Sequence, residues 1–170
     1  MNNNASKMFK ELIGLKVNEI YFQPTAGLLS DDNMFVFNFV GKEKNFSLHC
    51  FTFLRVIEKD QIILTSSDEF FDIEYHKIAE HSNDDFTERS LLKLRIDKLK
   101  DRLKNNAVKN VVCHKSGDVT IFFSNDITMS LYIDCHFCEY EYYRLLDLTK
   151  ENKYLVTFFD SNIVKTICVL

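Results

Sequence analysis

The sequence predicts an α+β fold: about eight mostly antiparallel strands, in one or more sheets, with one long helix packed on the sheet and a short N-terminal helix. Three observations lead to this prediction. Alternating apolar residues fill most of the chain, a single segment has helical periodicity, and the strand pattern of the first half returns faintly in the second. The chain contains 16 Phe and 7 Tyr but no Trp. Aromatic residues at this density favour half-buried pleated surfaces.

The first half predicts a short helix and then four strands. Met8 and Leu12 give residues 5–14 an apolar stripe, and Gly14 is placed to end that helix. The strands that we expect to follow are residues 15–22, 34–40, 45–57 and 61–66. In the second of these strands Phe35, Phe37 and Phe39 share one face, which indicates a buried side.

The second half predicts the long helix and the remaining strands. Four apolar residues spaced at helical intervals place a buried stripe on a helix over residues 86–104: Leu92, Ile96, Leu99 and Leu103. The strands that we expect to follow are residues 108–113, 118–124, 127–143, 154–160 and 163–169.

A weak internal repeat organises the chain. Residues 17–56 and residues 108–138 show the same succession of short strand patterns on either side of a charged middle section. We therefore predict a single domain over residues 1–170, with pseudo-repeat halves at about 15–66 and 107–169. The acidic segment 66–88 and the helix 86–104 join the halves.

Composition restricts the partners and the compartment. The net charge of −4 argues against general affinity for nucleic acid. The chain starts without a secretion signal and lacks an apolar run near the ~20 residues that span a bilayer, so we expect no membrane partner. Five Cys form an odd set without the spacing of a disulfide framework, which is typical of free thiols in a reducing cytoplasm.

Cys and His stand next to each other three times, as His49-Cys50, Cys113-His114 and Cys135-His136-Phe137-Cys138. A zinc site needs about four such ligands converging on one point. Neighbouring residues of a strand point to opposite faces, so each pair would be split. We expect structural Cys, surface His and no metal or cofactor, with metal binding as the alternative.

Catalytic motifs do not stand out. The sequence has no GxSxG turn for a nucleophile and no Gly-rich phosphate loop. We therefore expect a protein that is not an enzyme, although a site assembled from scattered residues remains an alternative.

The middle of the chain is polarised in charge. Residues 66–88 hold eight acidic residues against one Lys, and residues 89–104 hold seven basic residues against two Asp. The basic helix could neutralise the acidic segment within the chain, or the acidic segment could steer a basic partner. On the second interpretation the candidate partner-binding residues are Asp68, Glu69, Asp72, Glu74, Asp84 and Asp85.

A tyrosine-rich segment, residues 139–144, is a second candidate surface. Tyr is enriched at interface centres, which makes Glu139, Tyr140, Glu141 and Tyr142 candidate contacts. The alternative is that one face of this strand continues the core.

Several short motifs resemble the small cytoplasmic α+β immunity proteins of bacterial toxin–immunity systems, such as those of contact-dependent growth inhibition. The motifs are Ser47-Leu48 leading to Arg55, Ile62 to Asp68, Gly117-Asp118-Val119 through Phe123 to Asp126, and Glu139-Tyr140-Glu141. The resemblance implies a non-enzymatic cytoplasmic protein, monomeric or dimeric, that binds and blocks one cognate toxin. Such toxins are often nucleases, whose basic clefts would suit an acidic partner. A general protein-interaction domain is the alternative, and a Cys/His metal-binding protein or enzyme is a further one.

Overall fold

The fold is α+β with antiparallel strands, as the sequence predicts, and these strands form two sheets. A computed structural model describes residues 3–23, 34–70, 91–133, 141–150, 154–160 and 163–169 of the 170-residue chain, with the backbone alone for 69–70, 155–160 and 163–168. Within these ranges the chain forms 11 strands, two more than the nine strand ranges given above. The difference arises because two predicted long strands are each two strands.

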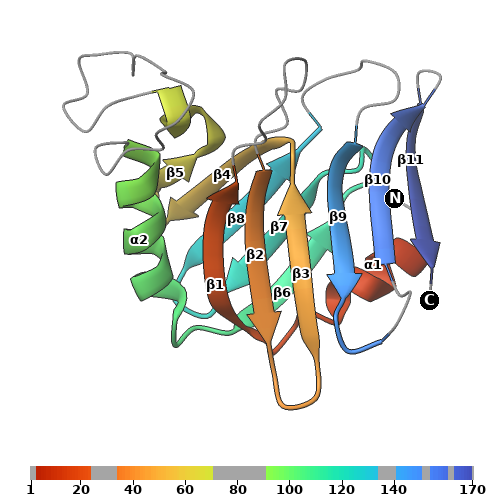
Figure 1. Cartoon of the computed structure of the whole chain (residues 1–170), viewed down its shortest axis with the longest axis horizontal. Coiled ribbons are helices and arrows are strands. Elements are labelled where there is room, and N and C mark those ends of the chain that lie inside the picture. Colours follow the sequence, from red (N-terminus) through yellow and green to blue (C-terminus); the bar gives the residue numbers. More distant parts are fainter. Residues whose placement is uncertain are drawn as a thin grey trace.

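The first sheet has six strands and lies in front in Figure 1. Its order is β1-β2-β3-β9-β10-β11, and every neighbouring pair is antiparallel. The strands are β1 (Lys16–Gln23), β2 (Met34–Val40), β3 (Asn45–Cys50), β9 (Glu141–Asp147), β10 (Tyr154–Asp160) and β11 (Ile163–Val169). A meander from the first half of the chain therefore meets a meander from the last third at the β3–β9 pair.

The second sheet has five strands and lies behind the first (Figure 1). Its order is β5-β4-β8-β7-β6, again antiparallel throughout. The strands are β4 (Phe53–Glu58), β5 (Gln61–Thr65), β6 (Val108–Cys113), β7 (Val119–Phe123) and β8 (Ile127–Tyr132).

The prediction of one strand over residues 45–57 is wrong, because the chain changes sheets inside it. β3 ends at Cys50 and β4 begins at Phe53. At the crossing the Phe51 amide donates to the Tyr142 carbonyl over 2.8 Å, and the buried Thr52 hydroxyl donates to the Tyr132 carbonyl. Corners between packed sheets are commonly made by strands that switch in this way.

The predicted strand over residues 127–143 is also divided between the sheets. β8 ends at Tyr132 in the five-stranded sheet, and β9 begins at Glu141 in the six-stranded sheet. Residues 134–140 lie outside the described ranges, so the predicted alternation of Cys135 and Phe137 is not described.

The core lies between the two sheets and consists of their inward-facing side chains. Phe35, Phe37 and Phe39 of β2 are buried on one face, as the alternation predicts. Leu54 and Leu131 meet them from the five-stranded sheet as fully buried residues of the same cluster. Burial of apolar surface on this scale is the main driving force for the fold.

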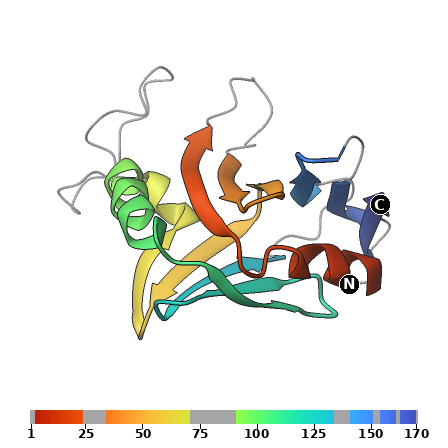
Figure 2. The same ribbon diagram turned by 90° about the horizontal axis from the view of Figure 1, so that it is seen from below.

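Two helices close the open ends between the sheets (Figure 2). α2 (Leu91–Leu103) packs against edge strands β1 and β5, and α1 (Asn3–Lys10) packs against β6 and β11. The predicted stripe of α2 is confirmed, since Leu92, Ile96, Leu99 and Leu103 are all buried. Residues 86–90, where we expected this helix to begin, lie outside the described ranges.

The elements follow the same order in the two halves of the chain. Each half starts with a helix, forms a three-stranded meander in one sheet and then crosses to the other sheet. β1 has a bulge between Val17 and Glu19, and β6 has one between Val108 and Asn110. An antiparallel bridge joins Lys16 to Ala107 just before these bulges.

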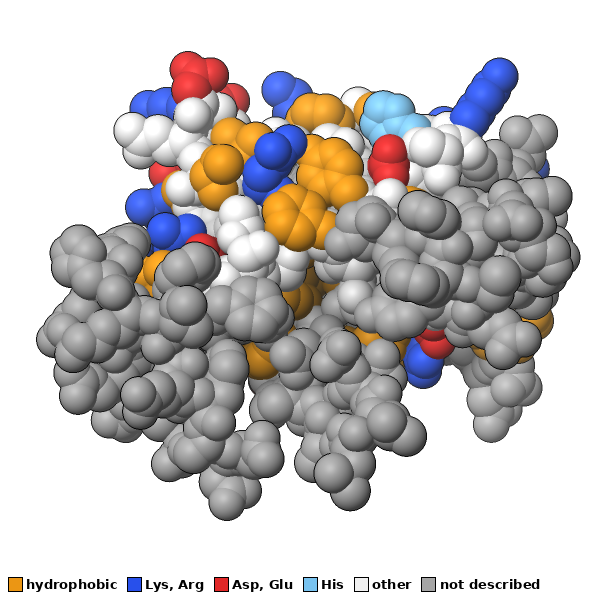
Figure 3. All heavy atoms as spheres, turned by 90° about the horizontal axis from the view of Figure 1, so that it is seen from above, with side chains coloured by type: hydrophobic (Ala, Val, Ile, Leu, Met, Phe, Trp, Pro, Cys, Tyr) orange, Lys and Arg blue, Asp and Glu red, His pale blue; other side chains and the backbone are white. Residues whose placement is uncertain are grey.

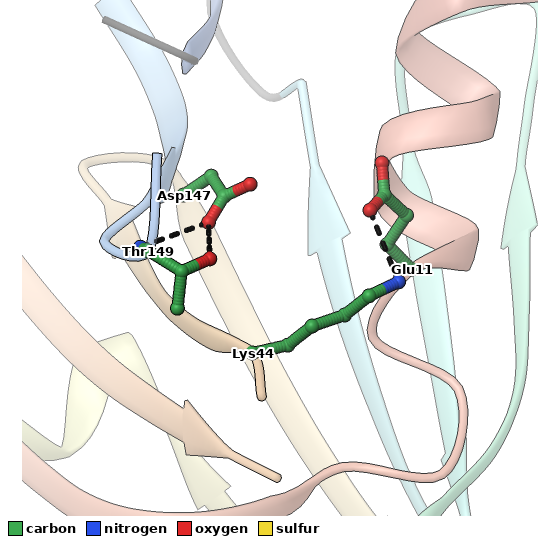
Figure 4. A network of polar contacts seen from close by, with 4 residues as sticks. All are labelled: Glu11, Lys44, Asp147 and Thr149. Carbon is green, nitrogen blue, oxygen red and sulfur yellow. Dashed lines mark hydrogen bonds and ion pairs between the residues drawn. The ribbon is translucent and has the colours of Figure 1, made fainter. Parts of the chain in front are cut away.

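Polar contacts fasten the β2–β3 turn to the end of α1 (Figure 4). Lys44 in the turn reaches Glu11 just after the helix, with 3.2 Å between Nζ and Oε2. Beside them, at the end of β9, Asp147 accepts hydrogen bonds from the backbone amide and the hydroxyl of Thr149. These contacts fix one rim of the two-sheet fold.

The helices of the described residues are too short or too polar to cross a membrane.

Candidate functional site

Asp68 is in the protein interior, so its prediction as an exposed partner contact is wrong. It lies in a short 3-10 helix, η1 (Ser66–Phe70), and its residue is 6% exposed. Nη1 of Arg95 donates to both carboxylate oxygens at 2.9 and 2.8 Å, and the Thr65 amide donates to Oδ2 at 2.8 Å. At this residue the acidic and basic segments neutralise each other within the chain, which joins α2 to the end of β5.

Tyr142 is also buried, so it too is wrongly predicted as a partner contact. Tyr142 and its neighbour Tyr143 are both fully buried members of the core cluster. The Tyr143 hydroxyl donates to the Gly117 carbonyl over 2.6 Å, and its ring meets the ring of Phe9 edge-on at 5.7 Å. This part of the tyrosine-rich segment continues the core.

Glu141 is half-buried and already has a partner in the chain. Nε and Nη2 of Arg144 donate to its two oxygens at 2.6 and 2.5 Å. The remaining sequence candidates lie outside the described side chains and stay predictions: Glu69, Asp72, Glu74, Asp84, Asp85, Glu139 and Tyr140.

A row of hydrogen-bonded polar side chains crosses the outer face of the six-stranded sheet. Asn38 Nδ2 donates to Glu19 Oε2 at 3.0 Å, so Asn38 Oδ1 faces the next strand. Ser47 donates to that oxygen at 2.7 Å, and His49 Nε2 lies 3.0 Å from the Ser47 oxygen. Because the Ser47 proton is used on Asn38, His49 is the donor to Ser47.

This Ser–His pair is arranged against nucleophilic catalysis. A catalytic base must accept the proton of the serine, whereas here the proton goes to Asn38 and the imidazole donates. Ser47 is only 5% exposed, so a substrate could not reach it. The row is a structural network that links β1, β2 and β3.

His49 sits beside the Arg144–Glu141 pair. Partial burial lowers the pKa of His49, and the neighbouring positive charge of Arg144 lowers it further, while Glu141 acts in the opposite direction. The Arg144 guanidinium lies over the ring of Phe51, 5.3 Å from its centre. Bonding to Glu141 raises the pKa of Arg144, which keeps this side chain charged.

The outer face of the five-stranded sheet is different, because large apolar side chains cover much of it. Alternation places these outward-facing side chains on the three central strands: Phe53, Arg55, Ile57, Thr120, Phe122, Thr128, Ser130 and Tyr132. Phe53 and Tyr132 are directly paired across β4 and β8, with ring centres 6.1 Å apart. Hydrophobic side chains surround a positively charged one along the upper edge of Figure 3, on the side of this sheet. We call these eight residues the aromatic face.

Arg55 is the charged residue among the eight of the aromatic face. Its guanidinium lies over the Tyr132 ring, 5.1 Å from the centre, and Nη2 donates to the Tyr132 hydroxyl over 2.6 Å. The Arg55 Nε atom is buried and makes no hydrogen bond. A buried N–H without a partner is uncommon and costly, so among the described residues the hydrogen bonding of this guanidinium is incomplete.

A small hollow of about 140 Å³ lies between β5 and α2. Ile62 and Leu94 contribute apolar surface to it, and Lys98 and Arg102 contribute charge. Arg102 is already bonded to Glu58 at 2.7 Å. The hollow has room for a few waters, and none of its lining residues belongs to the aromatic face.

The Cys and His residues that are described do not converge. Cys50 is fully buried in the core, whereas His49 lies on the outer face of the same strand. Burial raises the pKa of the Cys50 thiol and that of the Cys113 thiol. Across the described ranges no group of three or more metal-ligating side chains comes together.

Sequence reasoning missed most of the aromatic face. Arg55 appeared only as one residue of the immunity-protein resemblance, and Tyr132 lay within the repeated residues 108–138 without being singled out. The available signal was the alternation of Phe53, Arg55 and Ile57, which puts two large apolar side chains and an arginine on one face.

No protein-family model, curated protein or solved structure matches this chain.

Proposed function

We propose that this chain is an immunity-type protein, which binds the toxic domain of a bacterial protein toxin and neutralises it by stoichiometric, non-catalytic contact. The observation that carries the proposal is the aromatic face: an outer side of a sheet on which two Phe, one Ile and one Tyr, all half-buried, lie around an arginine. The resemblance of the short motifs to immunity proteins supports the choice of partner.

The composition of the aromatic face supports protein binding. An antiparallel sheet with one solvated side normally alternates apolar residues inside with polar residues outside. Here α1 and α2 pack at the sheet edges, and the outward side chains of the central strands include Phe53, Phe122 and Tyr132. Tyr and Arg are the residues that most often dominate binding energy at protein interfaces.

A sheet face also suits rigid docking. β4, β7 and β8 are held on both sides by neighbouring strands, so their side chains are pre-positioned. A surface that does not have to order itself on binding loses less free energy when the complex forms. This favours the tight, stoichiometric inhibition on which an immunity protein depends.

A general protein-interaction domain could use the same face, and toxin neutralisation is what separates the two functions. The steering role of the acidic segment 66–88 remains part of the proposal for its residues 71–88, which lie outside the described ranges. The cytoplasmic location is likewise proposed from the sequence.

The test is protection of bacterial cells. A candidate toxin domain, chosen from any secreted-protein gene that is found next to this chain's gene, is expressed from an inducible promoter, with and without the chain. We expect growth only when the chain is present, and a 1:1 complex of the purified proteins. Mass spectrometry should find the toxin domain chemically unchanged, because inhibition is by contact. Cell death despite a folded chain, or a covalently modified toxin domain, would contradict the proposal.

A further inference from the structure

Two arginines of this chain lie over aromatic rings, and they differ in one respect. Arg144 lies over Phe51 at 5.3 Å and Arg55 over Tyr132 at 5.1 Å. Arg144 has an acidic partner in its own chain, because two of its nitrogens donate to the carboxylate of Glu141. Arg55 donates from Nη2 to the Tyr132 hydroxyl, and its Nε has no hydrogen-bond partner.

Among the residues that the structure describes, three carboxylates of the five-stranded sheet and its surroundings have other partners. Asp68, near β5, holds Arg95, and Glu58 of β4 holds Arg102. Asp118, one residue before β7, accepts from the Ile133 amide at 2.9 Å and from the Ser116 hydroxyl at 2.8 Å. The fold thus leaves this guanidinium without an acidic partner among the described residues.

The surroundings of Arg55 favour a strong pairing with an incoming acid. The neighbouring outward side chains are Phe53, Ile57, Ser130 and Tyr132, none of them charged. When a partner covers this surface, water is removed from around the guanidinium, and a charge-assisted pair there is stronger than one in open solvent. The planar guanidinium can also hold both oxygens of a carboxylate while one of its faces lies on the ring.

We propose that Arg55, backed by Tyr132 and Phe53, is a recognition site for an Asp or Glu side chain that the partner presents within an apolar part of its surface. The bound carboxylate gives Arg55 the acidic partner that Arg144 has in Glu141. This inference rests on the proposed function for the identity of the partner. The site itself is defined by residues of the chain alone. At this face a positive side chain of the chain pairs with a negative side chain of the partner. In the steering expected from the acidic segment, the chain is negative and the partner is positive.

The site can be tested without the partner. NMR spectra of the arginine Nε–H groups are followed while the full chain is titrated with benzoate, a carboxylate with an apolar ring. Benzamide serves as the neutral control and inorganic phosphate as the competing anion. We expect a saturable shift of the Arg55 resonance with benzoate, at concentrations at least about tenfold below those needed with phosphate. Arg144 should shift little, because Glu141 already occupies it.

Three outcomes would overturn the site: no saturable shift at Arg55, an equal shift with benzamide, or tighter binding of phosphate than of benzoate. The last result would indicate a phosphate-bearing ligand instead.

The second arm uses the toxin domain and the matched pair of arginines. Arg55→Gln should weaken the complex about 100-fold or more, whereas Arg144→Gln should change it less than about threefold. Arg55→Lys should fall between, because lysine keeps the charge and loses the planar fork. Thermal melts confirm that each variant is folded.

Tight wild-type binding with an unaffected Arg55→Gln variant would contradict this inference and leave the proposed function standing. Failure of the wild type to bind any toxin domain, together with benzoate recognition at Arg55, would contradict the function and leave the site standing.

Discussion

At the scale of single residues, His49 makes the stability of the fold depend on pH. Burial and Arg144 lower its pKa in the folded chain, while Glu141 partly opposes them. The unfolded chain therefore binds the proton more readily, and stability falls as the pH drops below the ordinary histidine pKa of about 6.5. Above that value the effect is absent, because His49 is neutral in both states.

We expect the wild type to lose more stability between pH 7.5 and pH 5.5 than His49→Gln does, measured by urea unfolding. Glutamine can still donate to Ser47 but does not titrate. Equal pH dependence in the wild type and His49→Gln would show that His49 does not carry this effect.

The Asp68–Arg95 pair is the second residue-scale feature. Asp68→Asn should destabilise the fold by about 1–3 kcal/mol, because it leaves Arg95, which is itself partly buried, without its charged partner. Asp97→Asn removes an exposed pair with Lys100 on the same helix and should cost less than about 0.5 kcal/mol. Denaturant melts compare the two variants. Similar losses in both would mean that the Asp68 contact does not fasten α2.

At the scale of elements, α2 packs between the edge strands β1 and β5 and covers the core there. Leu99 is 1% exposed and lies on the buried stripe of the helix. Leu99→Ala should therefore cost about 2–5 kcal/mol in denaturant melts, from lost burial and the cavity left behind. The exposed neighbour Lys98→Ala is the control and should change stability by less than about 0.5 kcal/mol. A loss below about 1 kcal/mol for Leu99→Ala would mean that the stripe does not seal the core.

Local patterns predicted most elements, because alternation and helical spacing depend on neighbouring residues. The buried faces of β2 and α2 follow directly from Phe35, Phe37 and Phe39 and from the Leu92 to Leu103 stripe. The sheet change at Phe51 and Thr52 could not be predicted in this way. Apolar alternation continues across it, and the break is made by contacts with Tyr132 and Tyr142, some 80 to 90 residues away.

The candidate site was harder to predict for the same reason. Arg55 and Tyr132 are 77 residues apart in sequence, and only the pairing of β4 with β8 brings them together. Charge counts drew attention to residues 66–88, but counts cannot show that Asp68 turns inward to Arg95. The role of the remaining acidic residues stays a prediction.

At the scale of the whole molecule, the two sheets give the protein two unlike outer faces. On the six-stranded sheet, polar side chains from Glu19 to His49 are hydrogen-bonded to one another. On the five-stranded sheet, the aromatic face presents apolar surface around one incompletely paired arginine. The first arrangement needs no partner, and the second is what a protein partner would cover.

The most direct test of this account is calorimetric titration of the toxin domain into the wild type and two variants with a new acidic group. Phe53→Asp places a charge on the aromatic face, and Tyr21→Asp places the same charge on an exposed aromatic position of β1, in the other sheet. We predict that Tyr21→Asp binds the toxin domain like the wild type, while Phe53→Asp binds it at least about 100-fold more weakly. The melting temperature of the Phe53→Asp variant should be unchanged. The account would be contradicted if Phe53→Asp bound as tightly as the wild type while Tyr21→Asp lost binding, because the toxin would then dock on the six-stranded sheet.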